Sequence, residues 1–422
     1  MACLIIEYEL LKTAHRGQDS QARRNVSDSV NFRRQAGKST LLTTLFPQAE
    51  HVVFDPVIDV GGARRDPELF LGQHRTPLIL DEVQYAPELL GVIKRWSDRD
   101  PAPGRYLLTG SQNLMVLKSV SESMAGRVVV LELPFLSLVE RCAMAGASTS
   151  SWIDDLFSAE PFERLRARGR LEARALEPTL FARVWRGGFP RVLDLAEDVL
   201  PDVFASYLRT YVERDIRQVA AVKDQQMFSR FVALCAALTA QEINHSQLGR
   251  ELGISYQTAR RWLSVLVSTY QWVEVPPWHG DTVKRVSMRP KGYFADTGLA
   301  AWLQRISSPA ALGGHPLQGA LFETHVVLDT LKQVQQLSPP PRAWHWQSHG
   351  GAEVDLLLER DGIFVPIQIK CGARATRGDA RGILAFRDAY PGLRHGPGVV
   401  VAAVERCELL GDNLIALPYD LA

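Results

Sequence analysis

Short apolar runs alternate with amphipathic stretches between residues 50 and 135. The runs read "HVVFD", "TPLILDE", "RYLLTG" and "RVVVLELP", and polar or turn-forming residues bound each of them. Short runs that are apolar at nearly every position are typical of strands buried on both faces of a parallel sheet. Because the stretches between them have a helical period, the pattern predicts an α/β domain.

The pattern changes three times after this domain. Residues 141 to 225 are mainly of helical period, residues 226 to 305 contain two short helices and a hairpin pattern, and residues 306 to 422 combine a helix with strands. Residues 1 to 31 are mostly polar and follow neither period, which predicts a disordered segment. The predicted organisation is this segment, an α/β core at residues 32 to 140, a helical region, and two C-terminal regions.

A phosphate-binding motif stands just before the first predicted strand. Residues 37 to 40 read Gly-Lys-Ser-Thr and match the second half of the pattern G-x-x-x-x-G-K-[ST]. The first glycine of that pattern would stand at position 32, which is Phe32. A bulky residue resists the turn that lets backbone N–H groups surround a phosphate, so weakened nucleotide binding is predicted. The helix that begins near Lys38 would still present its N-terminus to an anion.

Two of the predicted strands end in residues that would complete a nucleotide site. Asp81 closes one strand and is expected to hold Mg²⁺ beside the hydroxyl of Ser39, while Glu82 would polarise the attacking water. The next strand leads to Ser111 and two further polar residues, one of which would sense the γ-phosphate. The motifs follow one another in the order that brings them to the carboxyl edge of the sheet, where α/β sheets bind ligands.

Five stretches together resemble one family. They are "RQAGKSTLL", "LILDEVQYAPELLGVIKRW", "RYLLTGSQNLMVLKSVSESMAGRVVVLELPFLSLVE", "YLRTYVERDIRQV" and "PKGYFADTGLAAWL". From about Arg34 onward the chain resembles the prokaryotic AAA-superfamily ATPases fused to a C-terminal domain of unknown function. The resemblance implies ATP as ligand, Mg²⁺ as cofactor, and Arg127 as a γ-phosphate or subunit contact. The implied nucleotide contacts are Gln35, Ala36, Gly37, Lys38, Ser39, Thr40 and Ser111.

The chain departs from that family before Arg34. The family's loop usually begins Gly-Pro-Arg-Gln after an apolar strand, and here Phe32-Arg33-Arg34-Gln35 stands in its place. Such an abrupt boundary is what a frameshift or a misassigned start would leave. The hypothesis is that the chain has a nucleotide-binding site and that the first half of its phosphate-binding loop is altered.

The stretch "HSQLGRELGISYQTARRWLSVLVSTY", residues 245 to 270, predicts a helix-turn-helix. Gly253 permits the turn, and residues 271 to 290 read as a hairpin with His279-Gly280-Asp281 at its tip. Two helices and a hairpin predict a winged helix whose second helix enters the major groove of DNA. The alternative is a winged helix used only for packing or protein contact. The expected DNA contacts are Tyr256, Gln257, Arg260 and Arg261.

The stretch "GAEVDLLLERDGIFVPIQIK", residues 351 to 370, predicts two strands joined by a turn. Asp355, Gln368 and Lys370 resemble the site of the PD-(D/E)XK nuclease fold, and Glu323 resembles the acidic residue that such folds often add. Mg²⁺ would bind Asp355 and the residue two before the lysine, and Lys370 would orient the attacking water. Gln368 stands where Glu is usual and is a weaker ligand. The alternative is a nuclease-like fold without catalysis that serves as a binding module.

Composition adds three exclusions. The chain has 48 Lys and Arg against 47 Asp and Glu, so its net charge of +1 gives no argument for nucleic acid or membrane as a partner. The five cysteines lie far apart, which argues against a disulfide framework or a zinc site and fits a reducing cytoplasm. No run of about 20 apolar residues occurs, so no membrane span is expected.

The leading hypothesis is a cytoplasmic ATP-binding protein of α/β class. Its P-loop AAA-type sheet and helical segment would drive or gate a winged helix-turn-helix and a C-terminal α/β nuclease-like domain. One alternative is a DNA-binding or Mg²⁺-dependent DNA-cleaving protein with a degenerate ATPase half. The other is a protein-interaction switch in which nucleotide changes partner binding and nothing is cut.

Overall fold

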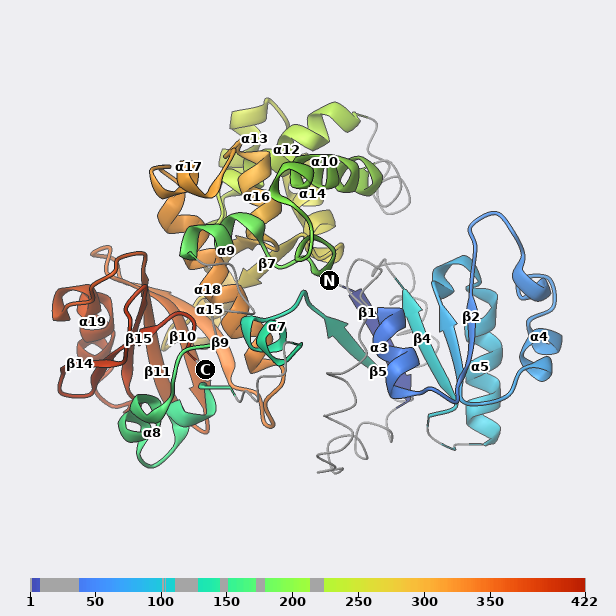
Figure 1. The fold of residues 1–422 in the computed structure, drawn as a ribbon, viewed down its shortest axis with the longest axis horizontal. Helices are drawn as coiled ribbons and strands as arrows, with labels where there is room; N and C mark the ends of the chain where they lie inside the picture. Colours follow the sequence, from blue (N-terminus) through green and yellow to red (C-terminus); the bar gives the residue numbers. More distant parts are fainter. Residues whose placement is uncertain are drawn as a thin grey trace.

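The computed structural model describes residues 2–7, 38–100, 102, 104–110, 128–144, 151–171, 179–212 and 224–421. Two sheets lie at opposite ends of the view in Figure 1, and a largely helical region lies above and between them. The N-terminal sheet has the strand order β2-β3-β4-β1-β5, and the C-terminal sheet has the path β14-β15-β13-β11-β10-β9 with β12 beside β11.

The N-terminal sheet contains the four strands that the apolar runs predict. β2 (Glu50–Val53), β3 (Leu78–Asp81) and β4 (Tyr106–Gly110) pair in parallel, and β5 (Val128–Leu133) lies at the far edge. The AAA-type expectation of a parallel sheet is met by these three strands. The helices of this region are α3 (Lys38–Leu45), α4 (Pro67–Gln73) and α5 (Glu88–Arg99).

The first residues of the chain correct one prediction. Ala2–Glu7 forms β1, which lies between β4 and β5 and is antiparallel to both. The expectation that residues 1 to 31 are disordered is therefore wrong for these six residues. The run from Leu4 to Ile6 is apolar and partly β-branched, so it suits a strand, and it pairs with β4 on one side and β5 on the other. The remainder of the predicted tail lies outside the described residues.

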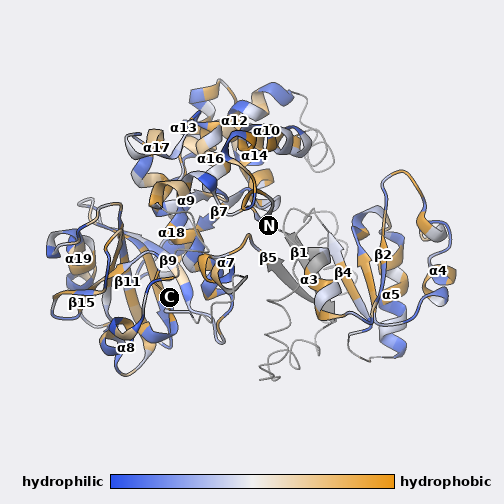
Figure 2. Cartoon of the chain, viewed as in Figure 1, coloured by the Kyte–Doolittle hydropathy of each residue, from blue (hydrophilic) through white to orange (hydrophobic). Residues whose placement is uncertain are grey.

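Side chains that alternate along the strands divide the N-terminal core into two layers. Leu78, Leu80 and Leu108 pack with residues of α4 and α5, while Ile79 and Leu107 pack with Leu42 of α3 on the other face. This is the period of two that a strand imposes. Figure 2 shows the hydrophobic residues on these strands and on the inner sides of the helices.

The chain between the two large sheets forms short helices and a small sheet. A three-stranded antiparallel sheet has the order β6-β8-β7. Its strands are β6 (Gln241–Glu242), β7 (Trp272–Val275) and β8 (Lys291–Phe294). The helices are α7 (Leu138–Met144), α8 (Pro161–Ala167), α9 (Leu180–Arg186), α10 (Leu200–Thr210), α12 (Gln225–Ala237), α13 (His245–Leu252), α14 (Tyr256–Ser268), α15 (Thr282–Ser287), α16 (Thr297–Leu303) and α17 (Pro309–Gly313).

The C-terminal sheet is covered on both faces. α18 (Gln318–Val334) packs on the face that carries Val399 and Val401, while α19 (Arg381–Ala389) packs on the face that carries Val400. The predicted hairpin is present, because Asp361 and Gly362 both have positive φ and join β10 to β11. The strands are β9 (Arg342–Gln347), β10 (Glu353–Arg360), β11 (Ile363–Lys370), β12 (Arg394–His395), β13 (Gly398–Ala402), β14 (Glu408–Gly411) and β15 (Leu414–Pro418).

Short 3₁₀ helices complete the described elements. They are Val60–Gly62, Val83–Tyr85, Asp154–Phe157, Pro190–Val192, Glu197–Val199 and Arg377–Ala380. Among the described residues we find no helix with the length and hydropathy that a bilayer crossing would require.

The connection between β7 and β8 corrects the predicted wing. The two strands pair in antiparallel fashion, but His279-Gly280-Asp281 is no hairpin tip, because Asp281 caps α15 by accepting from the N–H of Val283. Trp278 is 2% exposed and its ring contacts Phe364, Phe386 and Tyr390 of the C-terminal region. Burial of a large aromatic ring is more favourable in free energy than its exposure on a free loop. The connection is therefore held against the C-terminal sheet.

His345 of β9 lies at this contact and couples it to pH. Its backbone N–H donates to Pro276, its carbonyl accepts from Trp278, and its Nε2 lies 3.1 Å from the carbonyl oxygen of Arg289. Burial lowers the pKa of His345 to about 4, and the charge of Lys291 adds to this effect. The neutral ring is therefore favoured in the folded state, and Nε2 must carry the proton because the carbonyl can only accept.

Acid should loosen the contact through this histidine. The unfolded pKa is 6.5 and the folded pKa is lower, so the stabilisation is present above pH 6.5 and is lost as the pH falls toward 4. The loss amounts to about 3 kcal/mol at most. We expect His345→Gln, which keeps an N–H donor and does not titrate, to lose less unfolding free energy than the parent between pH 7 and pH 4.

The matched control is His349→Gln, because His349 is exposed in the same region. Urea unfolding at several pH values measures the effect. A parent and a His345→Gln variant with the same slope of unfolding free energy against pH would contradict the assignment.

Candidate functional site

The two predicted magnesium ligands meet at the carboxyl edge of the N-terminal sheet. Ser39 lies in the first turn of α3, and its Oγ donates a hydrogen bond to Oδ2 of Asp81 at the end of β3. The other carboxylate oxygen of Asp81 accepts from Oγ1 of Thr109 in β4. Asp81 is only 1% exposed, while Ser39 is half-buried at the rim.

The parallel register explains why these residues come together. Leu80 of β3 pairs with Leu108 of β4, so the next residues, Asp81 and Thr109, lie beside each other at the edge. His51 of β2 reaches the same place, with Nε2 3.5 Å from Oδ2 of Asp81. That nitrogen is buried and makes no hydrogen bond to any of the described residues. The ends of β3 and β4, the start of α3 and a side chain from β2 thus bring four polar side chains to one point.

The residues at this edge fit a magnesium ion with bound nucleotide. Mg²⁺ is held in such sites by one or two protein oxygens together with phosphate oxygens, and it prefers carboxylate and hydroxyl donors. Ser39 and Asp81 supply one of each, and Thr109 holds the carboxylate in place. When bound, the ion would neutralise charge on the phosphates.

Glu82 has an unusual backbone conformation beside the site. Its φ is 60° and its ψ is 43°, in the left-handed region that residues other than glycine rarely adopt. Its N–H donates to Oγ1 of Thr109 at 3.4 Å, and its carboxylate accepts from Nε2 of Gln84. Strained conformations of this kind cluster at functional sites. The turn leaves the Glu82 side chain half-exposed next to the buried Asp81.

Other predicted nucleotide contacts cannot be placed. Gln35, Ala36, Gly37, Ser111 and Arg127 lie outside the described residues, and so does Phe32, which replaces the first glycine of the loop. Lys38 and Thr40 lie on α3, but their side chains are outside the description. Thr109 and His51 were not predicted as site residues. The position of Thr109 at the polar end of an apolar run was the available signal, whereas nothing in the sequence marked His51.

A second cluster forms where the nuclease-like residues were predicted. Asp355 of β10, Gln368 of β11 and Glu323 of α18 come together, with Oδ2 of Asp355 accepting from Nε2 of Gln368 at 2.7 Å. The same oxygen accepts from the backbone N–H of Ile369 at 2.7 Å. The predicted Lys370, at the end of β11, forms none of these contacts.

A lysine that was not predicted lies at the centre of this cluster. The Nζ of Lys291, from β8, is 2.7 Å from Oε1 of Glu323 and 3.3 Å from Oδ1 of Asp355. The hydroxyl of Tyr293, two residues further along β8, donates to Oε1 of Glu323 at 3.0 Å. Lys291 was missed because its strand belongs to the preceding region, 64 positions before Asp355.

Burial and charge shift the protonation of these groups. Burial and the nearby charge of Asp355 raise the pKa of Glu323 to about 7, although Lys291 opposes this rise. Burial alone would lower the pKa of Lys291, but the charges of Glu323, Asp355 and Glu353 outweigh it and raise the pKa above its usual value. The ammonium is therefore the stable form at neutral pH.

This cluster does not fit a divalent cation as it stands. An ammonium already lies between the two carboxylates, and Gln368 turns its amide N–H, a group that cannot bind metal, toward Asp355. The other amide atom, Oε1, is buried and accepts no hydrogen bond from the described residues. Among the described residues, no three His, Cys, Asp or Glu side chains are placed to hold a metal ion. No metal-dependent step is derived for this region.

The helix-turn-helix has the predicted geometry. Gly253 ends α13 with a φ of 68°, and Ser255 caps α14 by accepting from the N–H of Thr258. Leu248 of α13 and Leu263 of α14 are buried in the shared core. The residues predicted to contact DNA are exposed on the outer side of α14. They are Tyr256, Gln257, Arg260 and Arg261.

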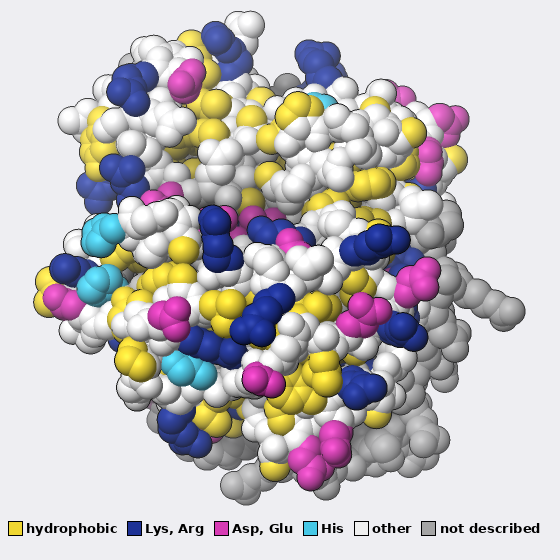
Figure 3. Space-filling model, turned by 90° about the vertical axis from the view of Figure 1, so that its left-hand side faces the viewer, with side chains coloured by type: hydrophobic (Ala, Val, Ile, Leu, Met, Phe, Trp, Pro, Cys, Tyr) yellow, Lys and Arg dark blue, Asp and Glu magenta, His cyan; other side chains and the backbone are white. Residues whose placement is uncertain are grey.

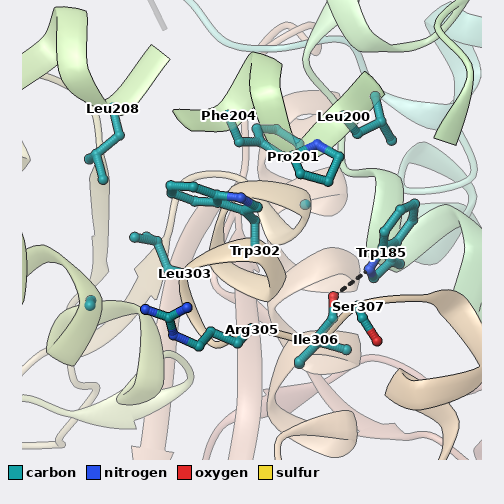
Figure 4. A pocket seen from close by; sticks show the side chains of 12 residues that line it. Trp185, Leu200, Pro201, Phe204, Leu208, Trp302, Leu303, Arg305, Ile306 and Ser307 are labelled. Carbon is teal, nitrogen blue, oxygen red and sulfur yellow. Dashed lines mark hydrogen bonds between the residues drawn. The ribbon is translucent and has the colours of Figure 1, made fainter. Parts of the chain in front are cut away.

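An apolar pocket of about 470 Å³ opens in the helical region. Figure 4 shows Trp302 facing Phe204 and Pro201 across it, with Trp185 at one side. The indole N–H of Trp185 donates to the carbonyl oxygen of Ile306 at 2.8 Å. Among the described residues that line the pocket, Arg305 is the one with a charged side chain, and none has a carboxylate or imidazole that could hold a metal or move a proton.

The exit of β5 is fastened to α18. The N–H of Leu138 donates to Oδ1 of Asp329 at 2.7 Å, and Nζ of Lys332 lies 3.3 Å from the carbonyl oxygen of Leu136. The acceptor, Asp329, and the donor, Lys332, both belong to α18, which also carries Glu323. The edge of the N-terminal sheet and the Lys291 cluster are therefore attached to the same helix.

Comparison with known families assigns the two ends of the chain. Residues 33–142 match the family described as an AAA domain, and residues 318–421 match a domain of unknown function, DUF4143. The region between them, residues 177–310, matches another domain of unknown function, DUF8612. An AAA-type P-loop domain followed by a C-terminal domain of unknown function is thus supported.

Individual proteins give the same coverage. The uncharacterized proteins Mb2031c of Mycobacterium bovis and Rv2008c of Mycobacterium tuberculosis are each 29% identical over 394 residues, which is 92% of this chain and 78% of theirs. The crystal structure of protein VC1899 from Vibrio cholerae covers 85% of this chain and 76% of its own at 11% identity, with a TM-score of 0.20, which carries no argument about the fold. The chain is similar to AAA-type ATPase domains in its N-terminal third, and nucleotide binding is the function that this similarity indicates.

Proposed function

We propose that this chain is a Mg²⁺-dependent ATPase whose nucleotide state acts on the C-terminal regions. The observation that carries the proposal is the contact between Ser39 and Asp81, which lie 42 positions apart and meet at the carboxyl edge of the sheet. A hydroxyl at the start of a helix beside a buried carboxylate at the end of a strand is the arrangement that P-loop ATPases use for Mg²⁺.

Each residue at the edge has a distinct role in this proposal. Ser39 and Asp81 bind the ion, and Thr109 fixes the orientation of the Asp81 carboxylate. Glu82 polarises the attacking water, which its half-exposed position permits. Lys38, at the first position of α3, neutralises the β- and γ-phosphates. Phe32 weakens the affinity for nucleotide without removing these groups.

The route from this site to the C-terminal regions runs through α18. β4 and β5 flank β1 in one sheet, and the segment after β5 is bound to α18 by Leu136 and Leu138. A displacement of the sheet edge on nucleotide binding would act directly on that helix. The attachment to α18 favours a protein in which nucleotide gates the C-terminal regions. It argues against an ATPase domain and C-terminal regions that act independently.

The ATPase proposal is tested with Lys38→Ala and Glu82→Gln. We expect Lys38→Ala to abolish ATP hydrolysis without unfolding the protein, because the phosphates lose their cation. Glu82→Gln should still bind ATP but should release phosphate at least about 100-fold more slowly, as is usual for loss of a general base. Phosphate release and calorimetric ATP titration measure the two effects.

Glu88→Gln is the matched control, because Glu88 is exposed at the start of α5 and has the same chemistry. Its ATPase rate should equal that of the parent. A Lys38→Ala variant that hydrolyses ATP at the parent's rate would remove the assignment.

A second function, binding of duplex DNA, is favoured by the exposed face of α14. Two arginines, a tyrosine and a glutamine project from the second helix of a helix-turn-helix, which is the position from which base edges and phosphates are reached. The start of the β7–β8 connection is packed against the C-terminal region at Trp278, while α15, which carries Lys284, is exposed. Figure 3 shows Lys and Arg side chains scattered among acidic ones on the face that it presents, without one continuous basic patch. In this second function α14 carries the DNA contacts.

We expect the double variant Arg260→Ala, Arg261→Ala to bind duplex DNA more weakly and to flatten the dependence of affinity on salt. The slope of log affinity against log salt should fall by about one for each phosphate contact removed. Fluorescence anisotropy between about 50 and 200 mM salt measures it. The double variant Arg394→Ala, Arg406→Ala removes the same charge from exposed positions in the C-terminal region and should leave the slope unchanged. If the parent has no duplex affinity at about 50 mM salt, α14 is a protein-contact surface.

A further inference from the structure

The cation at the centre of the nuclease-like cluster belongs to the chain itself. Lys291 comes from β8 of the preceding region, and its ammonium lies 2.7 Å from Glu323 and 3.3 Å from Asp355. Its side chain is 7% exposed, and the two carboxylates are 15% and 2% exposed. The ammonium lies between Asp355, which was expected to hold Mg²⁺, and Glu323, the additional acidic residue.

Several donors already surround the two carboxylates. Oδ2 of Asp355 accepts from Gln368 and from Ile369, and Oε1 of Glu323 accepts from Tyr293 as well as from Lys291. A divalent ion placed beside the ammonium would be repelled at a separation of a few ångströms in a buried site. Such an ion could bind only after Lys291 had left.

The segment that carries Lys291 is fixed at its other end too. Trp278, at the start of the same β7–β8 connection, is buried among aromatic rings of the C-terminal region. Two backbone hydrogen bonds with His345 of β9 hold the chain beside that ring. Trp278 and Lys291 thus attach the two ends of the β7–β8 connection to the C-terminal region.

We propose that Lys291 permanently replaces the divalent cation in this cluster, and that the acidic cluster functions as a receptor that binds the wing of the helix-turn-helix to the C-terminal domain. The domain then cleaves no nucleic acid, and its acidic residues serve to make the two regions one rigid unit. This inference is independent of the ATPase site.

The first test uses the unaltered chain and reductive methylation of lysines, followed by mass spectrometry. We expect Lys291 to be modified at least about tenfold more slowly than Lys284, because reaction requires the segment to open. Lys284 is the internal control, since it is exposed on α15 in the same connection. Addition of Mn²⁺ should leave the rate at Lys291 unchanged. Modification at the rate of Lys284, or acceleration by Mn²⁺, would overturn the proposal.

The second test removes the cation. Lys291→Met keeps the length of the side chain but leaves two buried carboxylates unpaired, so the melting temperature should fall by about 5–10 °C. The triple variant Lys291→Met, Glu323→Gln, Asp355→Asn replaces the whole charged group by neutral side chains and should recover most of that loss. A triple variant as unstable as Lys291→Met would show that the charges do not hold the contact.

The same variants report on metal binding. Any Mn²⁺ bound at the ATPase site is the same in all of them, so differences between variants come from the cluster. Lys291→Met should bind Mn²⁺ at least about tenfold more tightly than the parent, which corresponds to about 1.4 kcal/mol, and the triple variant should lose this gain. Paramagnetic resonance of free Mn²⁺ measures both. Equal Mn²⁺ binding by the parent and by Lys291→Met, with loss in the triple variant, would instead make the cluster a working metal site.

Discussion

Burial of aspartate carboxylates is the constraint that joins the regions of this chain. Six of the described aspartates are at most 8% exposed, and each would be costly to bury without donors or cations around it. The partners come from distant segments, as in the bonds from Leu138 to Asp329 and from Arg183 to Asp420, which span 191 and 237 positions. Satisfying each carboxylate therefore decides which segments lie together. The six are Asp81, Asp155, Asp296, Asp329, Asp355 and Asp420.

The partners of a buried aspartate also decide what it can do. The described partners of Asp81 include the hydroxyls of Ser39 and Thr109, and a hydroxyl can turn a lone pair toward a metal ion. Asp355 is held by an ammonium and two N–H groups, none of which can bind metal. The two sites have the same acidic residue at a strand, yet one fits Mg²⁺ with nucleotide and the other carries its own cation. Residue type alone could not have separated these cases.

Local patterns predicted the parts of the structure that depend on neighbouring residues. The four apolar strands, the turn at Asp361 and Gly362, and the helix-turn-helix follow from periodicity and turn chemistry, which act over a few positions. The meeting of Ser39 with Asp81 followed from the order of motifs in an α/β sheet. The nuclease-like residues Glu323, Asp355 and Gln368 were also expected together.

Long-range packing produced what the sequence could not predict. β1 lies between β4 and β5, and this position depends on pairing with strands that are distant in the sequence. Local sequence patterns carry no information about such pairing. The aromatic residues that surround Trp278 come from β11 and from the region of α19, so the wing looked like a free hairpin. Lys291 lies in an ordinary strand, and only its distance to Glu323 distinguishes it from a surface lysine. The sequence therefore identifies side chains that are chemically able to bind a ligand or metal. It is less informative about which of these side chains already have an ion-pair or hydrogen-bond partner within the chain.

α18 is attached to other segments at two points, and these attachments determine how a displacement in one region could reach another. The helix has 17 residues, and its Glu323 and Lys332 are nine positions apart, or about 14 Å along a stiff rod. One point binds the exit of β5 through Leu136 and Leu138, and the other binds β8 through Lys291. Because the wing and the C-terminal sheet are joined at the second point, a shift at the first would move them as one body. Nucleotide binding would then reorient the exposed face of α14 together with the C-terminal domain, and relative motion would concentrate at the connection after β5.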